Sequence, residues 1–78
     1  MPTVFQEGPF DFVIFSSDAG EPPHIHVKRD RQVVKFWLDP VILAKNKGFK
    51  THEVNQITRL VVKYQARLLE SWHDYFGS

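Results

Sequence analysis

The chain has 78 residues, of which 42% are hydrophobic, with seven Phe, two Trp and two Tyr and a formal net charge of +1. This length predicts one globular domain over residues 1–78, whose small core relies on aromatic side chains. The lack of cysteine excludes disulfides and Cys-ligated zinc sites, and the near-neutral charge gives no bulk case for binding nucleic acid or membranes.

The first half of the chain predicts antiparallel strands. Four runs rich in aromatic and β-branched residues are the strand candidates: residues 2–5 (PTVF), 10–16 (FDFVIFS), 24–28 (HIHVK) and 32–38 (QVVKFWL). The second run places Phe10, Phe12 and Ile14 on one face. The Pro22-Pro23 step delivers an extended chain into the third run, and only a short turn separates the third from the fourth, so these two predict a hairpin.

The second half of the chain predicts helices. Asp39 and Pro40 are typical of a helix start, so a short helix is expected near residues 40–47. Thr51 can cap a long amphipathic helix near residues 52–76. Apolar side chains recur along it at three- and four-residue spacing: Val54, Ile57, Val61, Tyr64, Leu68, Trp72 and Tyr75. Such a stripe needs a sheet to cover, so the sequence predicts an α+β fold: a three- or four-stranded antiparallel sheet with the C-terminal helix packed across it.

No run approaches the ~20 apolar residues of a membrane span. The beginning of the chain also lacks the basic segment followed by an apolar segment that marks a signal peptide. We therefore expect a cytoplasmic protein with no membrane partner.

Two histidines lie one residue apart in the third strand candidate. Alternation puts His24, His26 and Lys28 on one face and the apolar pair, Ile25 and Val27, on the other, toward the helix. The Cβ atoms of residues two apart on a strand are about 6–7 Å from each other. Such a pair can chelate zinc or another divalent metal, provided that a third ligand arrives from elsewhere.

His73 is the candidate for that third ligand. There is a geometric objection, because His24 and His26 face away from the helix that carries His73. A bend at the sheet edge, a flexible C-terminus or a second chain would be needed to bring them together. Two other interpretations stay open: a solvated face, with His73 partly buried elsewhere, or an acid–base role for one histidine without metal.

Basic residues gather in the middle of the chain. Between residues 28 and 50 they outnumber the acidic ones: Lys28, Arg29, Arg31, Lys35, Lys45, Lys47 and Lys50 against Asp30 and Asp39. This excess suits a phosphate backbone or simply a solvated basic face. Trp37 falls on the outer strand face near the histidines, where an aromatic ring beside basic groups is typical of a binding patch. The candidate contacts with a partner or nucleic acid are Pro22, Pro23, Arg29, Arg31 and Trp37.

The motifs EPPHIHV, FWLDP and WHxYF (here WHDYF), with MPTVF at the start, together resemble a family of short bacterial and archaeal proteins of unknown function. The resemblance covers nearly the whole chain. It implies a cytoplasmic α+β domain encoded beside a second small protein, in an arrangement typical of toxin–antitoxin-like pairs. It therefore implies a partner more than a chemistry, and it brings no catalytic residues over to this chain.

Three functions follow as alternatives. The first is an interaction module, one component of a toxin–antitoxin-like pair, that acts through a small protein encoded nearby and on RNA or DNA, with self-association left open. The second is an RNA-cleaving or metal-dependent enzyme, whose candidate catalytic residues are His24, His26, Lys28, Lys35 and His73. The third is a regulator whose basic face contacts DNA. No cofactor is expected except, in the second case, zinc or another divalent metal on His24 and His26.

Overall fold

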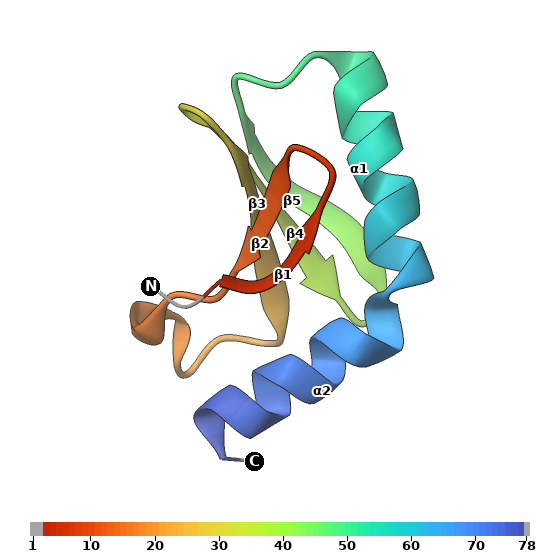
Figure 1. Cartoon of the computed structure of the whole chain (residues 1–78). Helices are drawn as coiled ribbons and strands as arrows, with labels where there is room; N and C mark the ends of the chain where they lie inside the picture. Colours follow the sequence, from red (N-terminus) through yellow and green to blue (C-terminus); the bar gives the residue numbers. More distant parts are fainter. Residues whose placement is uncertain (1–2, 78) are drawn as a thin grey trace.

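The computed structural model describes residues 3–77 and places five antiparallel strands in one sheet (Figure 1). Each strand pairs with its neighbour in the chain, so the order across the sheet is β1-β2-β3-β4-β5. The strands are β1 (Thr3–Glu7), β2 (Phe10–Val13), β3 (His24–Arg29), β4 (Gln32–Leu38) and β5 (Val41–Lys47), and a short 3-10 helix, η1 (Ser16–Asp18), lies between β2 and β3. The predicted α+β class and the predicted hairpin of β3 with β4 are confirmed, but the sheet has five strands, not three or four, because residues 41–47 add a strand.

The predicted short helix near residues 40–47 is wrong, because this segment is strand β5. Asp39 and Pro40 form the turn of a β4–β5 hairpin instead of starting a helix. The pairing register shifts by one residue between Leu43 and Lys45, and this bulge breaks the alternation that a regular strand displays. Without β5 the sheet would expose the edge of β4, and pairing that edge outweighs the helix propensity of the segment.

Two helices cover one face of the sheet: α1 (Thr51–Lys63) and α2 (Gln65–Phe76). The sequence predicts one long helix near residues 52–76, and the structure breaks it at Tyr64. The Tyr64 ring packs on Phe5 of β1 with ring centroids 4.6 Å apart, and Gln65 donates a hydrogen bond of 2.6 Å to the carbonyl of Leu38. These contacts hold the bend, so α2 turns across the end of the sheet (Figure 1).

The core lies between the sheet and the helices. Phe10, Phe12 and Ile14 are all buried, which confirms their predicted common face. The other buried apolar residues of this cluster come from both layers: Ile25, Val27, Val34, Phe36, Leu38, Phe49, Ile57, Val61, Leu68 and Trp72. Four members of the predicted stripe are buried, namely Ile57, Val61, Leu68 and Trp72. Val54 and Tyr64 are half-buried, and Tyr75 is exposed. Within the described residues, neither helix is long and apolar enough to cross a membrane.

Arg29, at the end of β3, ties the sheet to the start of α1. It pairs with the carboxylate of Glu53 and donates a hydrogen bond of 2.8 Å to Gln32. Glu53 also accepts a hydrogen bond of 2.9 Å from the backbone N–H of Lys50, the residue before the helix. The Lys50 N–H, together with Arg29, holds the pKa of Glu53 below its ordinary value. The guanidinium of Arg29 is therefore engaged within the fold.

Candidate functional site

The sheet face turned away from the helices, termed the open face, carries a row of basic side chains. Cross-strand pairing arranges it in three rungs over β3, β4 and β5: Lys28–Val33–Lys47, His26–Lys35–Lys45 and His24–Trp37–Ile42. Like charges opposite each other on neighbouring strands repel, as Lys35 and Lys45 do here. An anion bound between them would remove that repulsion.

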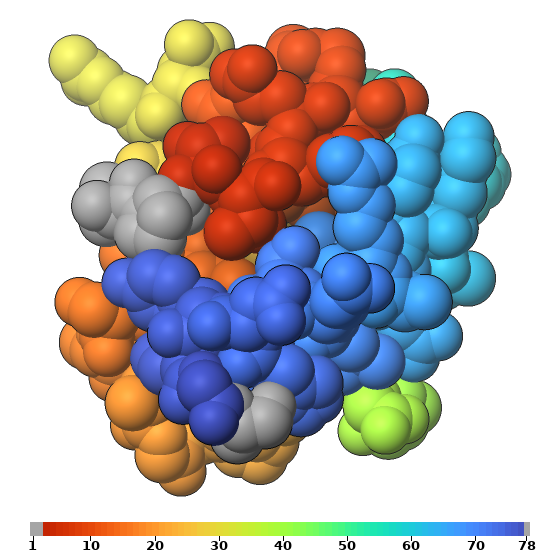
Figure 2. Space-filling view, turned by 60° about the horizontal axis from the view of Figure 1, so that its bottom comes forward, coloured from red at the N-terminus to blue at the C-terminus, as the bar shows by residue number. Residues whose placement is uncertain are grey.

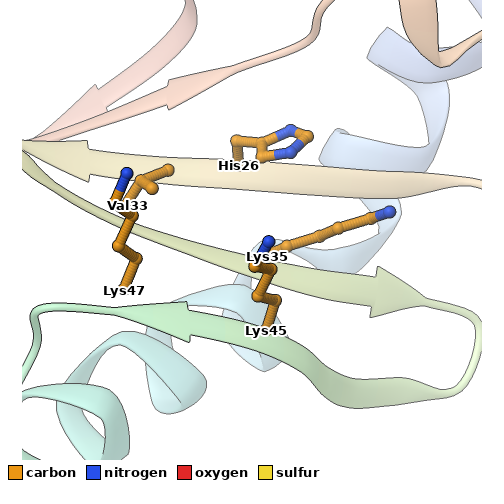
Figure 3. A pocket seen from close by; sticks show the side chains of 5 residues that line it. All are labelled: His26, Val33, Lys35, Lys45 and Lys47. Carbon is orange, nitrogen blue, oxygen red and sulfur yellow. The ribbon is translucent and has the colours of Figure 1, made fainter.

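A hollow of about 260 Å³ lies in the open face (Figure 3). Side chains from three strands line it: His26, Val33, Lys35, Lys45 and Lys47. Among the described residues, Lys35 is the only one of these lysines that pairs with a carboxylate, that of Glu21 at 2.9 Å, and its hydrogen bond lowers the pKa of Glu21. The Lys35 ammonium also lies 4.5 Å from the centre of the Trp37 ring. A hollow lined by ammonium groups and no carboxylate suits a phosphate.

His24 is fully buried, with 0% of its surface exposed. The loop before β3 and the end of α2 close over it, and Figure 2 shows these two segments side by side, the loop in orange and the helix in blue. Its ring lies 4.8 Å from the ring of Trp72 and 5.5 Å from that of Trp37. Its Nδ1 lies 2.9 Å from the carbonyl oxygen of Pro22. The solvated-face interpretation is therefore wrong for His24.

Asp18, at the end of η1, joins the two histidines. Its Oδ2 atom lies 3.0 Å from Nε2 of His24 and 3.7 Å from Nδ1 of His26. The same oxygen accepts a hydrogen bond of 3.1 Å from the backbone N–H of Phe15, which fixes the carboxylate. One ligand atom from each of the three side chains lies within 4.8 Å of the others. One carboxylate and two imidazoles form a donor set that divalent metals bind in proteins.

His26 belongs to both features, because it lines the hollow and lies beside Asp18. Its ring packs edge-on against Phe15 at 4.5 Å and lies 5.3 Å from the ring of His24. Burial lowers the pKa of His26, the Asp18 carboxylate opposes that change, and the charges of His24 and Lys35 add to it. The ring is thus held neutral near pH 7, the form that accepts a proton or coordinates a metal.

His73 lies outside this cluster, because it is exposed on α2. The C-terminal segment does reach the histidines, through the break between α1 and α2 and not through a bend at the sheet edge, and it brings the indole of Trp72 to His24. Of the two lysines predicted as catalytic candidates, Lys35 lines the hollow, and Lys28 lies beside it on β3, in the rung of Val33 and Lys47.

The candidate partner contacts divide into two groups. Arg29 is engaged with Glu53 and lies over the ring of Phe49 at 5.3 Å, so the structure does not present it to a partner. Arg31 is exposed in the β3–β4 turn, and Trp37 is partly exposed on the open face.

Pro22 and Pro23 serve the fold of the loop that leads into β3. The carbonyl of Pro22 accepts the hydrogen bond from His24. The carbonyl of Pro23 accepts one of 3.1 Å from the backbone N–H of Leu38. The Pro-Pro step therefore positions His24 at the start of β3. This agrees with the expectation that the step leads an extended chain into the strand.

Sequence reasoning missed three residues of the site. Asp18 lies in a loop, where no periodicity indicates the direction of a carboxylate. Lys45 and Lys47 were placed on a helix, whereas a strand paired with β4 puts both on the face of Lys35. A two-residue Asp39-Pro40 segment between two apolar runs also suits the turn of a hairpin, and this is the signal that could have indicated β5.

Comparison with known proteins gives one match. The family described as "Domain of unknown function (DUF4160)" matches residues 10–73, a range that includes the hollow and the cluster of Asp18, His24 and His26. No curated protein and no solved structure matches the chain. The expected membership of a family of unknown function is confirmed, and the chain belongs to the DUF4160 family.

Proposed function

We propose that the protein is a small interaction module that binds single-stranded nucleic acid, RNA in the first instance, across the open face of its sheet. The observation that carries this proposal is the hollow lined by Lys35, Lys45 and Lys47 with no carboxylate among its walls. A backbone phosphate in the hollow would meet the ammonium groups of Lys45 and Lys47 on β5. Lys35 on β4 and Lys28 on β3, in the same rungs, add positive charge beside it.

Aromatic side chains on the open face favour a single strand over a duplex. Trp37 and His26 are partly exposed beside the lysines. Unpaired bases stack on such rings, whereas the bases of a duplex already stack on one another. Within residues 3–77, α1 covers the opposite face of the sheet and α2 crosses its end over His24, and neither helix lines the hollow, so none is placed there to enter a major groove.

The test is a salt titration of binding to a labelled oligouridylate of about 12 nucleotides, a length that spans a typical single-strand site. If the four lysines of the open face each neutralise one phosphate, the slope of log K against log salt should be about −2 to −3. Fluorescence anisotropy between about 50 and 200 mM salt measures this slope. Absence of binding at the lowest salt would contradict the proposal. Tighter binding to duplex DNA than to the oligouridylate would favour the alternative of a regulator whose basic face contacts DNA.

A second candidate function is an RNA-cleaving enzyme, which the position of His26 favours. Its ring lies between the hollow and the Asp18 carboxylate, and its lowered pKa keeps it neutral. It would take the proton of a ribose 2′-hydroxyl as that oxygen attacks the adjacent phosphorus. The bond from phosphorus to the 5′-oxygen breaks, the leaving oxygen takes a proton from water, and Lys35 stabilises the charge on the phosphate.

This second function predicts growth arrest when the protein is expressed in bacteria. His26→Gln removes the proton acceptor and should abolish the arrest, while the purified variant keeps a folded NMR spectrum. His73→Gln changes an exposed histidine outside the cluster and serves as the matched control. Arrest that persists unchanged in His26→Gln would exclude this mechanism.

We also propose, on the family resemblance, that a small protein encoded nearby is the partner in a toxin–antitoxin-like pair. Strand β5 supports an association of this kind, because it is an edge of the sheet and exposes 52% of Ile42 and 46% of Leu43. A strand from a partner can pair with such an edge. Copurification of the two gene products tests the association. A protein that stays monomeric and does not bind the second protein at micromolar concentration would contradict it.

A further inference from the structure

We propose that Asp18, His24 and His26 form a binding site for one divalent transition-metal ion, with zinc as the representative. The proposal stands on the geometry of these three side chains and does not depend on nucleic-acid binding. Ions of this group accept imidazole nitrogens and carboxylate oxygens together. Three protein ligands would leave one coordination position open, as in zinc sites that bind a water or a substrate.

The hydrogen bond of His24 to the backbone determines which ring nitrogen carries the proton. Nδ1 lies 2.9 Å from the carbonyl oxygen of Pro22, and a carbonyl can only accept, so Nδ1 is protonated. In the neutral ring, Nε2 then holds a lone pair, and it lies 3.0 Å from the lone pairs of the Asp18 carboxylate. These two groups repel unless a cation stands between them. Histidines that bind metals commonly donate their other N–H to a backbone carbonyl in this way.

The two ring nitrogens that face Asp18 have no hydrogen-bond partner among residues 3–77. They are Nε2 of His24 and Nδ1 of His26. Nε2 of His24 is close to the carboxylate, but the two atoms lack the alignment of an N–H···O hydrogen bond. A buried ring nitrogen without a partner is costly, and native proteins rarely keep one without a reason. One metal ion would supply a partner to both nitrogens.

The spacing of the ligand atoms fits an ion of this size. Metal–ligand bonds of about 2.0–2.2 Å at tetrahedral angles place neighbouring ligand atoms about 3.3–3.6 Å apart. The distances from Oδ2 of Asp18 to the two ring nitrogens are 3.0 Å and 3.7 Å, one on each side of that range, and the two nitrogens lie within 4.8 Å of each other. Small side-chain shifts would therefore bring the three atoms onto one ion.

The surrounding contacts hold the three ligands in place. The Asp18 carboxylate accepts the N–H of Phe15 at 3.1 Å, and the Phe15 ring packs against His26 at 4.5 Å. The His24 ring contacts the rings of Trp37 and Trp72. Ligands positioned in advance bind an ion without a further ordering cost. The competing arrangement is a proton on Nε2, which would make His24 an imidazolium paired with Asp18.

The test uses the full chain carrying His52→Gln and His73→Gln, because these two histidines are exposed and would bind metal nonspecifically. Protein stripped with a chelator is titrated with zinc chloride by calorimetry, and with Co²⁺, whose visible absorption reports the coordination geometry. We expect one ion per chain, a Kd in the micromolar range or tighter, and a Tm that rises with added zinc. In ¹⁵N spectra of the rings, Nε2 of His24 and Nδ1 of His26 should shift, while Nδ1 of His24 keeps its proton.

Two variants test the ligand assignment. Asp18→Asn keeps an oxygen for the N–H of Phe15 but loses the charge, and we expect zinc to bind at least about 10-fold more weakly. His26→Gln, on the partly exposed side of the cluster, should do the same and remains informative if Asp18→Asn does not fold. The proposal is overturned if zinc does not bind, or if both variants bind it as tightly as the parent does. It is also overturned if the ¹⁵N spectra show protons on both ring nitrogens of His24 and do not change when zinc is added.

Discussion

Replacing Trp72 by alanine is expected to lower the free energy of unfolding by about 3–5 kcal/mol, the range for large aromatic residues in cores. The Trp72 side chain lies on α2 with 5% exposed, and its indole packs on the rings of His24 at 4.8 Å and Phe76 at 4.4 Å. A chain of 78 residues has a total stability of about 4–12 kcal/mol. The variant should therefore lose a large part of its stability, measured by urea denaturation with far-UV circular dichroism.

Tyr75→Ala is the control for this prediction. Tyr75 lies on the same helix with 40% of its surface exposed, so its loss is expected to change the stability by less than about 1 kcal/mol. Equal effects of the two substitutions would mean that α2 does not pack over His24 as described.

Reversing both lysine charges on β5, with Lys45→Glu and Lys47→Glu, is expected to weaken binding of oligouridylate by about 100-fold at low salt. Two attractions to phosphate become two repulsions at the wall of the hollow. Both side chains are exposed, so the fold should keep its stability within about 1 kcal/mol. Fluorescence anisotropy gives the affinity, and thermal unfolding checks the fold.

The matched control places the same change of charge behind the sheet. Arg59→Glu with Lys63→Glu alters two exposed residues of α1, the helix that covers the other face. If net charge alone governed binding, both double variants would lose the same affinity, and the open face would not be the binding surface. A single Lys45→Ala change should reduce the magnitude of the salt slope by about 0.7, the contribution of one phosphate contact to a single strand.

Alternation of side chains was sufficient to orient strands β2 to β4. In β3 it placed His24 and His26 opposite Ile25 and Val27, and the structure agrees. In β5 the bulge at Ala44 shifts the phase of the strand, so its seven residues do not display the alternation of a regular strand. The one extra residue therefore removed the period-2 pattern by which β5 could have been recognised as a strand.

The break between the helices has no sequence signal of its own. The segment around Tyr64 contains neither Pro nor Gly, and the apolar stripe continues through it. What holds the bend is the packing of Tyr64 on Phe5 together with the hydrogen bond from Gln65 to Leu38, two contacts between residues far apart in the chain. Periodicity describes one element at a time, and it carries no information about such a contact.

Only the residues of the candidate site that lie on one strand could be predicted from the sequence. His24 and His26 follow from the period of β3, but the direction of Asp18 depends on the hydrogen bond from the N–H of Phe15. Consecutive residues on a helix point about 100° apart, so a small change in where α2 docks decides whether His73 or Trp72 reaches the cluster. The structure places the indole there.

The strand order has a consequence for how the chain closes. Every pairing in the sheet joins neighbouring segments of the sequence. Three hairpins close turns of two residues and β2–β3 closes a connection of ten (14–23), so the entropic cost of each closure is small. The contact between Trp72 and His24 is different, because it joins segments far apart in the chain. We expect the hairpins to form early and this corner to form late. Local opening there would admit solvent to His24 while the sheet itself stays paired.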